Sequence, residues 1–326
     1  MRGVVDIMEY GGYLPFELRK GKDYFSDQYS VLKLNSGRAA LAAAVKESNI
    51  KKIWIPYYNC NVVYKMLSQY CNCMFYYLDK EMNPIIDNLS PDEWILVVNY
   101  FGNRNGENLT YLKNKYKRII IDNTQAFFSA PISGCFNIYS CRKFFGVSDG
   151  AYLVTDKGYN FKNSYKRDVS WKRCNYLLRS IEEGTNAAYQ DSIHSEEDIA
   201  FDINEMSILT NQIMQSIDYD CVLKRRRANQ KILVEELGNI NEITIRINDE
   251  DLIAYPLLVR DDKLRTELVR NKIYVPQWWK YLKDIVKKET VEYEYSTFLN
   301  MIPLDQRYEE NDIMKMVNII KKILCH

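Results

Sequence analysis

Segments typical of strands and of helices alternate between about residue 30 and residue 155, and this alternation limits the choice of fold more than any other feature. The strand-like segments are short runs rich in β-branched and aromatic residues, whereas the helix-like segments carry apolar residues three or four positions apart. The strand-like segments are "KKIWIPYY", "CMFYYLD", "EWILVVNYFG", "RIIIDNTQAFF", "FNIYS" and "GAYLVT", and the helix-like ones among them are "SGRAALAAAVKES", "NVVYKMLSQ" and "NLTYLKNKYK". This pattern predicts an α/β fold with a mostly parallel sheet covered by helices.

The rest of the chain has a different pattern, which predicts a second unit. Residues 160 to 230 are mainly helical and highly charged, and the apolar spacing of a helix continues to a glycine stop at Gly238. The segments "EITIRI", "AYPLLV", "LRTELVRNKIYV" and "IMKMVNIIKKIL" then predict strand, strand, helix and helix. Since 326 residues suffice for two domains, we expect a large domain over 1–220 and a smaller α+β domain over 221–326, with segment 1–25 a candidate to pack on the small domain.

The charge balance excludes several classes of partner. A formal net charge of +1, from 44 basic and 43 acidic residues, leaves no electrostatic footprint for nucleic acid or an anionic membrane. The basic run 224–227, "KRRR", lies within an amphipathic helical pattern and is interpreted as a solvated or subunit-facing surface. No segment has the apolar core of a signal peptide or the length of a membrane span, so we expect a cytoplasmic protein. Its partners are then small molecules or other protein surfaces.

The supply of reactive side chains narrows the chemistry. Only two histidines occur, which excludes most triad and poly-histidine metal schemes, and no metal site is expected. The eight cysteines form no C-x-x-C pair and are interpreted as free thiols. No G-x-G-x-x-G or G-x-x-x-x-G-K-[ST] motif supports a nucleotide phosphate loop. An enzyme with this composition would rely on lysine and carboxylate chemistry, with a bound cofactor.

Polar residues gather where the predicted strands end. Tyr57 to Asn59, Asn99 to Asn103 and Asp122 to Gln125 each follow an apolar run. Because functional groups of parallel sheets collect at the carboxyl ends of the strands, these ends predict one crevice.

Three features follow in an order that suits a pyridoxal phosphate site. "LNSGRAAL" places Ser36, Gly37 and Arg38 at the start of a helix, where backbone amides can bind a phosphate. Asp122 ends a buried-looking strand, and a carboxylate there can pair with a protonated pyridine nitrogen. Lys143 lies in the loop after "FNIYS" and supplies a primary amine. Taken alone, Asp122 equally suits a turn, and a loop lysine is usually a solvated charge.

Together these motifs resemble the DegT/StrS-type sugar-nucleotide aminotransferase family of fold-type I pyridoxal phosphate-dependent enzymes. The resemblance covers nearly the whole chain, in order. The matching elements are "SGRAAL" for the phosphate turn, "IPYYNC" for a strand end, "IDNTQA" for the aspartate element, "YSCRKFFGVSDGA" for the lysine segment, "MSILTNQIMQSID" and "KRRRANQ" for two helices and "IPL" near the C-terminus.

The resemblance implies a role for each matching residue. Lys143 would be the Schiff-base lysine, and Asp122 the partner of the pyridine nitrogen. Gln125 would contact the ring or its phenolic oxygen, and Tyr58 would stack on the ring face. The phosphate shell would consist of Ser36, Gly37, Arg38 and Ser140. Taken alone, Tyr58 is one of 26 tyrosines, and a single aromatic of this kind is more often a core or interface residue.

The chain also departs from the family pattern. Ser140 lies only three positions before Lys143, so the phosphate contact from Ser140 is either lost or made by Arg142. Trp278 and Trp279 are candidates to wall the pocket, although an aromatic pair is more often packing.

The resemblance implies a homodimeric aminotransferase that moves an amino group from glutamate to a nucleotide-linked keto sugar. Two alternatives stay open. One is a pyridoxal phosphate enzyme that acts on a non-sugar amine or catalyses elimination. The other is a non-catalytic relative, although the lysine and aspartate that such a relative would lose are both present.

Overall fold

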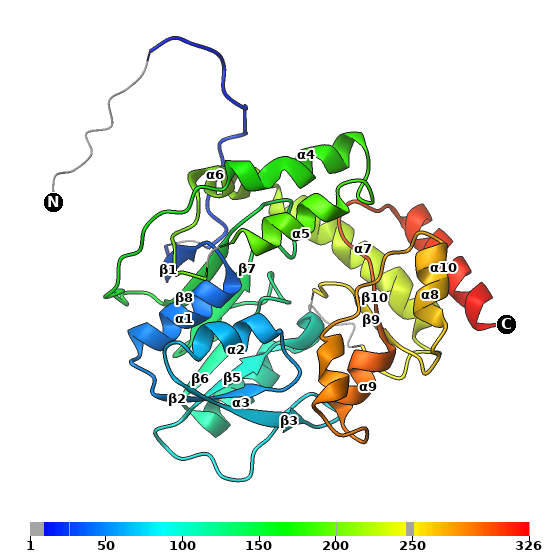
Figure 1. Cartoon of the computed structure of the whole chain (residues 1–326), viewed down its shortest axis with the longest axis horizontal. Coiled ribbons are helices and arrows are strands. Elements are labelled where there is room, and N and C mark those ends of the chain that lie inside the picture. The colour runs from blue at the N-terminus through cyan, green and yellow to red at the C-terminus, as the bar shows by residue number, and fades with distance from the viewer. Residues whose placement is uncertain (1–9, 26, 200, 246–250, 326) are drawn as a thin grey trace.

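The computed structural model describes residues 10–25, 27–199, 201–245 and 251–325. An eight-stranded sheet with the order β1-β8-β7-β6-β5-β2-β3-β4 forms its centre (Figure 1). The strands are β1 Tyr29–Leu34, β2 Lys52–Pro56, β3 Asn72–Leu78, β4 Pro84–Ile85, β5 Trp94–Val98, β6 Ile119–Asp122, β7 Phe136–Ser140 and β8 Ala151–Asp156. The β3-β2-β5-β6-β7 core is parallel, and β1, β8 and β4 join its edges antiparallel. The predicted α/β class is confirmed.

Helices cover both faces of this sheet. In β2, Ile53 and Ile55 pack into one cluster with α1 and α2, whereas Trp54 between them packs into a second cluster on the other face with α3. This alternation follows from the two-residue period of a strand. The helices before residue 217 are α1 Gly37–Glu47, α2 Asn61–Leu67, α3 Gly106–Tyr116, α4 Asn175–Glu182, α5 Tyr189–Glu197 and α6 Ile208–Ser216, with short 3-10 turns at Tyr100–Gly102 and Trp171–Cys174.

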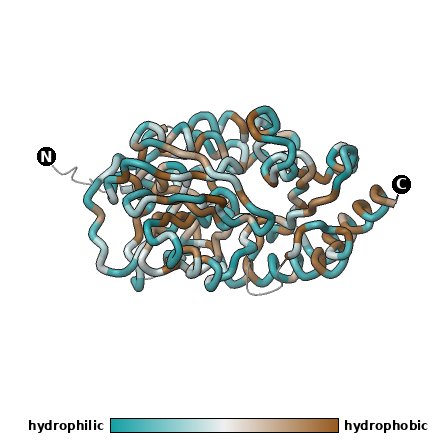
Figure 2. Tube along the Cα trace, turned by 90° about the horizontal axis from the view of Figure 1, so that it is seen from below, coloured by the Kyte–Doolittle hydropathy of each residue, from teal (hydrophilic) through white to brown (hydrophobic). Residues whose placement is uncertain are grey.

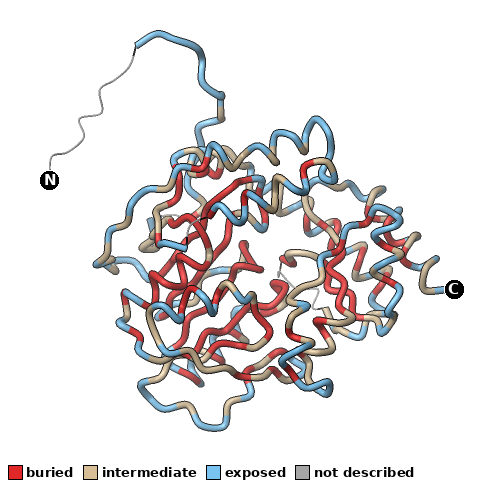
Figure 3. The backbone as a smooth tube through the Cα atoms, viewed as in Figure 1, coloured by how far each residue is buried: buried red, intermediate tan, exposed pale blue. Residues whose placement is uncertain are grey.

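A smaller unit follows in the sequence and packs beside the sheet (Figure 1). It contains the antiparallel pair β9 Tyr255–Leu258 and β10 Leu299–Ile302 together with α7 Tyr219–Leu237, α8 Leu264–Arg270, α9 Val291–Phe298, α10 Glu310–Leu324 and a 3-10 turn at Lys280–Asp284. Apolar side chains of this unit and of the sheet form one continuous cluster. Brown, hydrophobic stretches of the chain run through the interior in Figure 2. The central strands of the sheet and the β9–β10 pair are buried and are drawn red in Figure 3. The division at residue 220 stays a prediction.

The described end of the N-terminal segment is held by aromatic contacts and one ion pair. Residues 1–9 lie outside the described residues. Tyr24 and Phe25 pack against Phe127, with ring centroids 4.9 and 6.3 Å from it, and Asp23 binds Lys33 of β1 at 2.7 Å. Tyr24 also packs on Tyr219 of the helix Tyr219–Leu237, with ring centroids 4.7 Å apart, so the described end of the segment lies in an aromatic cluster that includes side chains from both parts of the chain. The placement of segment 1–25 stays a prediction.

Two local predictions differ from the structure, whereas a third agrees with it. The helical pattern before Gly238 forms two helices, α6 and α7, separated at Ile217, which is extended, as the two family helices implied. Residues 242–245 of the predicted strand "EITIRI" are not in a strand, and 246–247 lie outside the described residues. The predicted helix 264–275 ends at Arg270 because Lys272 adopts a left-handed conformation, with φ 61°. No described helix is long and apolar enough to cross a membrane.

Candidate active site

One large pocket, with a volume of about 1090 Å³, is lined by residues that follow the carboxyl ends of β2, β6 and β7 and by residues of the small unit. It contains the predicted residues Ser36, Gly37, Arg38, Asp122, Gln125, Ser140 and Lys143, and both Trp278 and Trp279 line it as well. Tyr58 is missing from this set. The predicted crevice therefore exists, and these residues come from four separate stretches of sequence.

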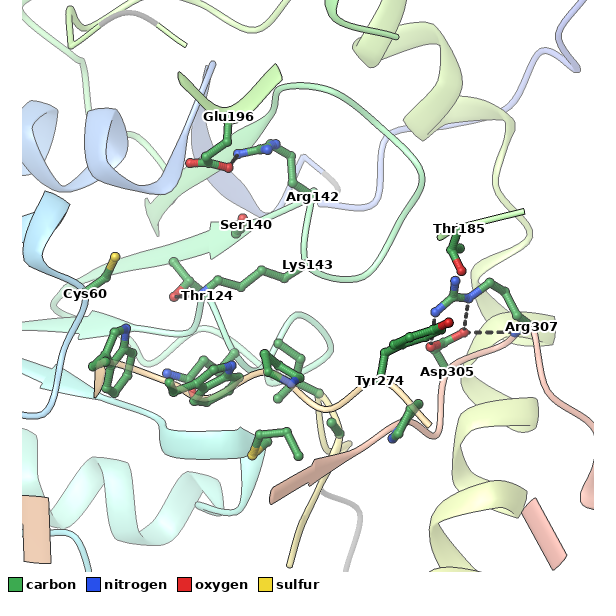
Figure 4. A pocket seen from close by; sticks show the side chains of 18 of the residues that line it. Cys60, Thr124, Ser140, Arg142, Lys143, Thr185, Glu196, Tyr274, Asp305 and Arg307 are labelled. Atoms are coloured by element: carbon green, nitrogen blue, oxygen red, sulfur yellow. Dashed lines mark hydrogen bonds and ion pairs between the residues drawn. The ribbon is translucent and has the colours of Figure 1, made fainter. Parts of the chain in front are cut away.

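Lys143 lies in the loop that follows β7, and its side chain extends into the pocket toward Thr124 (Figure 4). Its Nζ donates a hydrogen bond to Thr124 Oγ1 over 3.2 Å. Burial lowers the pKa of Lys143, and the negative charge of Asp122 only partly opposes this effect. A buried amine with a lowered pKa is the form of lysine that suits nucleophilic or acid-base chemistry.

Asp122 is the last residue of β6 and is almost completely buried. Its Oδ1 accepts the backbone N–H of Thr124 over 2.9 Å. Burial raises the pKa of Asp122, while Lys143 and the hydrogen bonds from Thr124 act in the opposite direction. Burial thus shifts the pKa of both Lys143 and Asp122 toward the neutral form of each side chain, and pKa shifts of this kind are typical of functional sites.

The start of α1 forms a second wall. Ser36 is the N-cap, and its side chain accepts the N–H of Ala39 over 3.3 Å. Gly37 allows a close approach, because a Cβ there would lie only 3.0 Å from Thr124 Cγ2. The first amides of a helix have no intrahelical partner and carry a partial positive charge, so this end of the pocket suits an anion.

Two arginines converge on one carboxylate beside that wall. Glu196 of α5 binds Arg142 at 2.5 Å (Figure 4). The same carboxylate lies 3.5 Å from Arg38. Arg38 also donates to the Ile199 carbonyl over 2.7 Å and stacks on Phe201, so its side chain holds the segment after α5. The Arg38 guanidinium is thus engaged by Glu196 and the Ile199 carbonyl, whereas Arg142, the residue before Lys143, is engaged by Glu196.

Gln125 and Ser140 line the pocket, as the predicted contacts require, and both are buried. The side-chain oxygen of Gln125 accepts the Phe101 N–H over 2.9 Å, which fixes its orientation. Tyr58 does not face the pocket, contrary to its prediction as the stacking aromatic. Its ring is fully buried edge-on against Trp279, with centroids 4.5 Å apart.

Several pocket residues were missed at the sequence level. Thr124 stands between two predicted residues in "DNTQ" and Cys60 comes two positions after Tyr58, so both lay within reach of the motifs. Glu196 carried no sequence signal. At the far end, Arg307 makes a double ion pair with Asp305 beside Thr185 and Tyr274 (Figure 4). Within the described ranges, no group of three or more His, Cys, Asp or Glu side chains could hold a metal ion.

Comparison with solved structures defines the class of fold. The chain matches the sugar aminotransferase CalS13 from Micromonospora echinospora with a TM-score of 0.59 and 16% identity, over 90% of this chain and 87% of that one. It matches NtdA from Bacillus subtilis with bound cofactor PMP at 0.62 and 13%, over 89% and 73%. The sugar aminotransferase Spr1654 from Streptococcus pneumoniae, described as putative, matches in its PLP form at 0.62 and 12%, over 90% and 86%.

These likenesses show that the chain has the fold of the sugar aminotransferases, the fold-type I architecture of pyridoxal phosphate-dependent enzymes. A DegT/DnrJ/EryC1/StrS aminotransferase from Brucella abortus shares it too, with a TM-score of 0.59 and 13% identity over 90% of this chain and 85% of that one. The resemblance seen in the sequence motifs is thus confirmed at the level of the fold. No protein-family model and no curated protein matches the chain by sequence.

Proposed function

We propose that this protein is a pyridoxal phosphate-dependent aminotransferase that transfers an amino group from glutamate to a nucleotide-linked keto sugar. The observation that carries the proposal is the buried pair of Lys143 and Asp122 facing one large pocket. The fold supports it, because it is shared with NtdA in a structure with bound PMP and with Spr1654, described as a putative sugar aminotransferase, in its PLP form.

The residues present fit this cofactor. Bound pyridoxal phosphate supplies an electron sink that stabilises negative charge at the donor's α-carbon. Asp122 is buried and oriented by the Thr124 amide, and its carboxylate would keep the pyridine nitrogen protonated. Lys143 would supply the amine that anchors the cofactor, and the same amine would hold and return a proton at that α-carbon. The Gln125 side chain borders the same space.

The phosphate would bind at the start of α1. There the amides of Gly37 and Arg38, the Ser140 hydroxyl and the Arg142 guanidinium border one end of the pocket. The buried Nε atoms of Arg38 and Arg142 have no hydrogen-bond partner within the part of the chain that is described, so donors are available beside this end. Trp278 and Trp279 would wall the opposite side.

The pocket volume supports a large acceptor. Typical small-molecule pockets measure about 300–1000 Å³, so a volume of about 1090 Å³ has room for a cofactor together with a second sizeable ligand. Its lining includes the basic residues Lys272, Lys315 and Arg307, of which Lys315 pairs with Asp312 and Arg307 with Asp305, and Tyr274 and Tyr308 are available for stacking. These groups favour a nucleotide-linked acceptor over a small amine.

We include in the proposal a homodimer and a cytoplasmic location. Val169, Trp171, Leu178 and Ile181, around α4, expose more than half of their surface, as an unfilled subunit contact would. The eight cysteines are all free, which suits a reducing compartment.

The test is a half-reaction followed by absorption. The protein is loaded with pyridoxal phosphate, and its visible band, roughly 410–430 nm for the protonated cofactor-lysine linkage, is recorded as glutamate is added. Loss of this band with formation of pyridoxamine phosphate supports transamination, and a nucleotide-linked keto sugar should then restore it. Release of ammonia without pyridoxamine phosphate would instead identify an elimination. Absence of any band would favour the non-catalytic alternative.

A further inference from the structure

We propose that Thr124 is a positioning residue that holds the amine of Lys143 and couples it to Asp122. A role in catalysis for Thr124 rests on the proposed function, whereas its contacts with Lys143 and Asp122 are present in the structure without a cofactor. Thr124 is a residue that the sequence motifs left without a role.

Thr124 touches each of the three parts of the site. Its hydroxyl oxygen lies 3.2 Å from Lys143 Nζ, and its backbone N–H binds Asp122 Oδ1 at 2.9 Å. Its methyl group borders Gly37, since a Cβ on Gly37 would lie 3.0 Å from Thr124 Cγ2. The side chain therefore has a fixed orientation, with the methyl toward α1 and the hydroxyl toward the amine.

The amine needs such a partner. A lysine side chain has four rotatable bonds, and ordering it in a buried site costs conformational entropy. Within the described residues, Thr124 Oγ1 is the only hydrogen-bond partner of Lys143 Nζ. An amine without it would be free to rotate about its terminal bonds. The hydroxyl thus keeps Nζ on the side of the pocket where Asp122 lies.

The hydrogen bond also affects protonation in a predictable direction. An ammonium group gains more from an oxygen acceptor than a neutral amine does, so the bond to Thr124 favours the charged form of Lys143. The other groups that act on Lys143 are the Asp122 carboxylate on β6, the Cys60 thiol before α2, the Glu196 carboxylate on α5 and the Arg142 guanidinium on the same loop. Of these groups, only Asp122 also depends on the Thr124 side chain, which helps to lower the pKa of that carboxyl; its loss would weaken the negative charge beside Lys143 and so acts on the pKa of Lys143 in the same direction.

Thr124→Val separates the hydroxyl from the shape of the side chain, because valine keeps the methyl that borders Gly37. Thr124→Ser keeps the hydroxyl and removes the methyl. Thr155→Val removes a buried threonine hydroxyl from β8, outside the pocket, and serves as the matched control.

The experiment measures the titration of Lys143 in the protein without cofactor. Competitive acetylation with acetic anhydride is followed between pH 6 and 11, and the labelled peptide is quantified by mass spectrometry. We expect Thr124→Val to lower the pKa of Lys143 by about one unit, a tenfold change in acidity, which is the size of one charged hydrogen bond. Thr124→Ser and Thr155→Val should titrate like the wild type. If the valine variant unfolds, Thr124→Ala provides the same comparison.

An unchanged pKa in a folded Thr124→Val or Thr124→Ala variant would overturn the inference. So would an equal shift in Thr124→Ser, since packing and not the hydroxyl would then matter. The titration needs no cofactor, so its outcome is independent of the proposed function. A protein that fails to bind pyridoxal phosphate but shows the expected shift would refute the aminotransferase and leave the role of Thr124 toward Lys143 intact.

Discussion

Replacement of Glu196 by glutamine should strengthen anion binding at the start of α1. The Glu196 carboxylate lies 2.5 Å from Arg142 and 3.5 Å from Arg38, and it neutralises part of the positive charge that an incoming phosphate would meet. Glutamine keeps the shape of the side chain, but it removes the charge and one of the two oxygens that contact the arginines. In the variant, the positive charges of Arg38 and Arg142 should therefore be less neutralised than in the wild type.

The magnitude follows from burial. Two unit charges 4 Å apart interact by about 4 kcal/mol at a partly buried site and by about 1 kcal/mol in water. The Glu196 side chain is 52% exposed, although those of Arg38 and Arg142 are only 7% and 19% exposed. Because Glu196 is half exposed to solvent, the energy of its interaction with the two arginines lies closer to about 1 kcal/mol than to about 4 kcal/mol. A gain of about 1 kcal/mol corresponds to roughly fivefold tighter binding.

Isothermal titration calorimetry provides the assay, with inorganic phosphate and pyridoxal phosphate as separate ligands at low and high salt. Glu197→Gln, on the exposed neighbour, is the matched control and should change the affinity little. The gain in Glu196→Gln should shrink as salt rises. Weaker phosphate binding in Glu196→Gln than in Glu197→Gln would refute the reasoning, because it would mean that Glu196 organises the arginines and does not compete for them.

Three further changes test other parts of the structure. Asp122→Asn should lower the pKa of Lys143 further, because the Asp122 carboxylate raises that pKa in the wild type. The free energy of unfolding increases with pH between the folded and the unfolded pKa of Lys143, so in the variant this pH window should begin at a lower pH and still end near the unfolded value of about 10.4. Urea unfolding at several pH values measures this window. Tyr58→Phe should change stability by less than about 0.5 kcal/mol and leave cofactor affinity unchanged, because the phenol oxygen is buried without a partner in the described part of the chain. A tenfold loss of cofactor affinity would restore Tyr58 to the site. Arg226→Met should cost about 3 kcal/mol in chemical denaturation, since this buried side chain donates to two backbone carbonyls at 2.8 and 2.9 Å, whereas the more exposed Arg225→Met should cost far less; equal losses would contradict the assignment.

Much of the fold could be predicted because strand and helix periods are local properties. The parallel core of β2, β5, β6 and β7 and the glycine stop after α7 both followed from such patterns. Strand β10 did not, because a four-residue strand is specified mainly by its pairing with β9. Arg226 also escaped, since a basic run reads as a solvated face until the fold surrounds one of its members.

The residues of the candidate site show the same difference between local sequence signals and features that depend on packing. Lys143 and Asp122 were found because their order along the chain matches a family pattern, and order survives large changes in sequence. Tyr58 was misplaced because the direction of a side chain just after a strand depends on the turn that follows. Glu196 could not be found, since its position over two arginines is set by the packing of α5 and not by a neighbouring motif.

The most direct test of the account is the identity of the residue that binds the cofactor. The protein is incubated with pyridoxal phosphate, treated with borohydride, digested and analysed by mass spectrometry, with Lys143→Ala beside the wild type. The account predicts a single stable pyridoxyl group on Lys143, and none in the variant. Attachment to another lysine, or equal labelling of both proteins, would contradict the assignment of this pocket as a pyridoxal phosphate site.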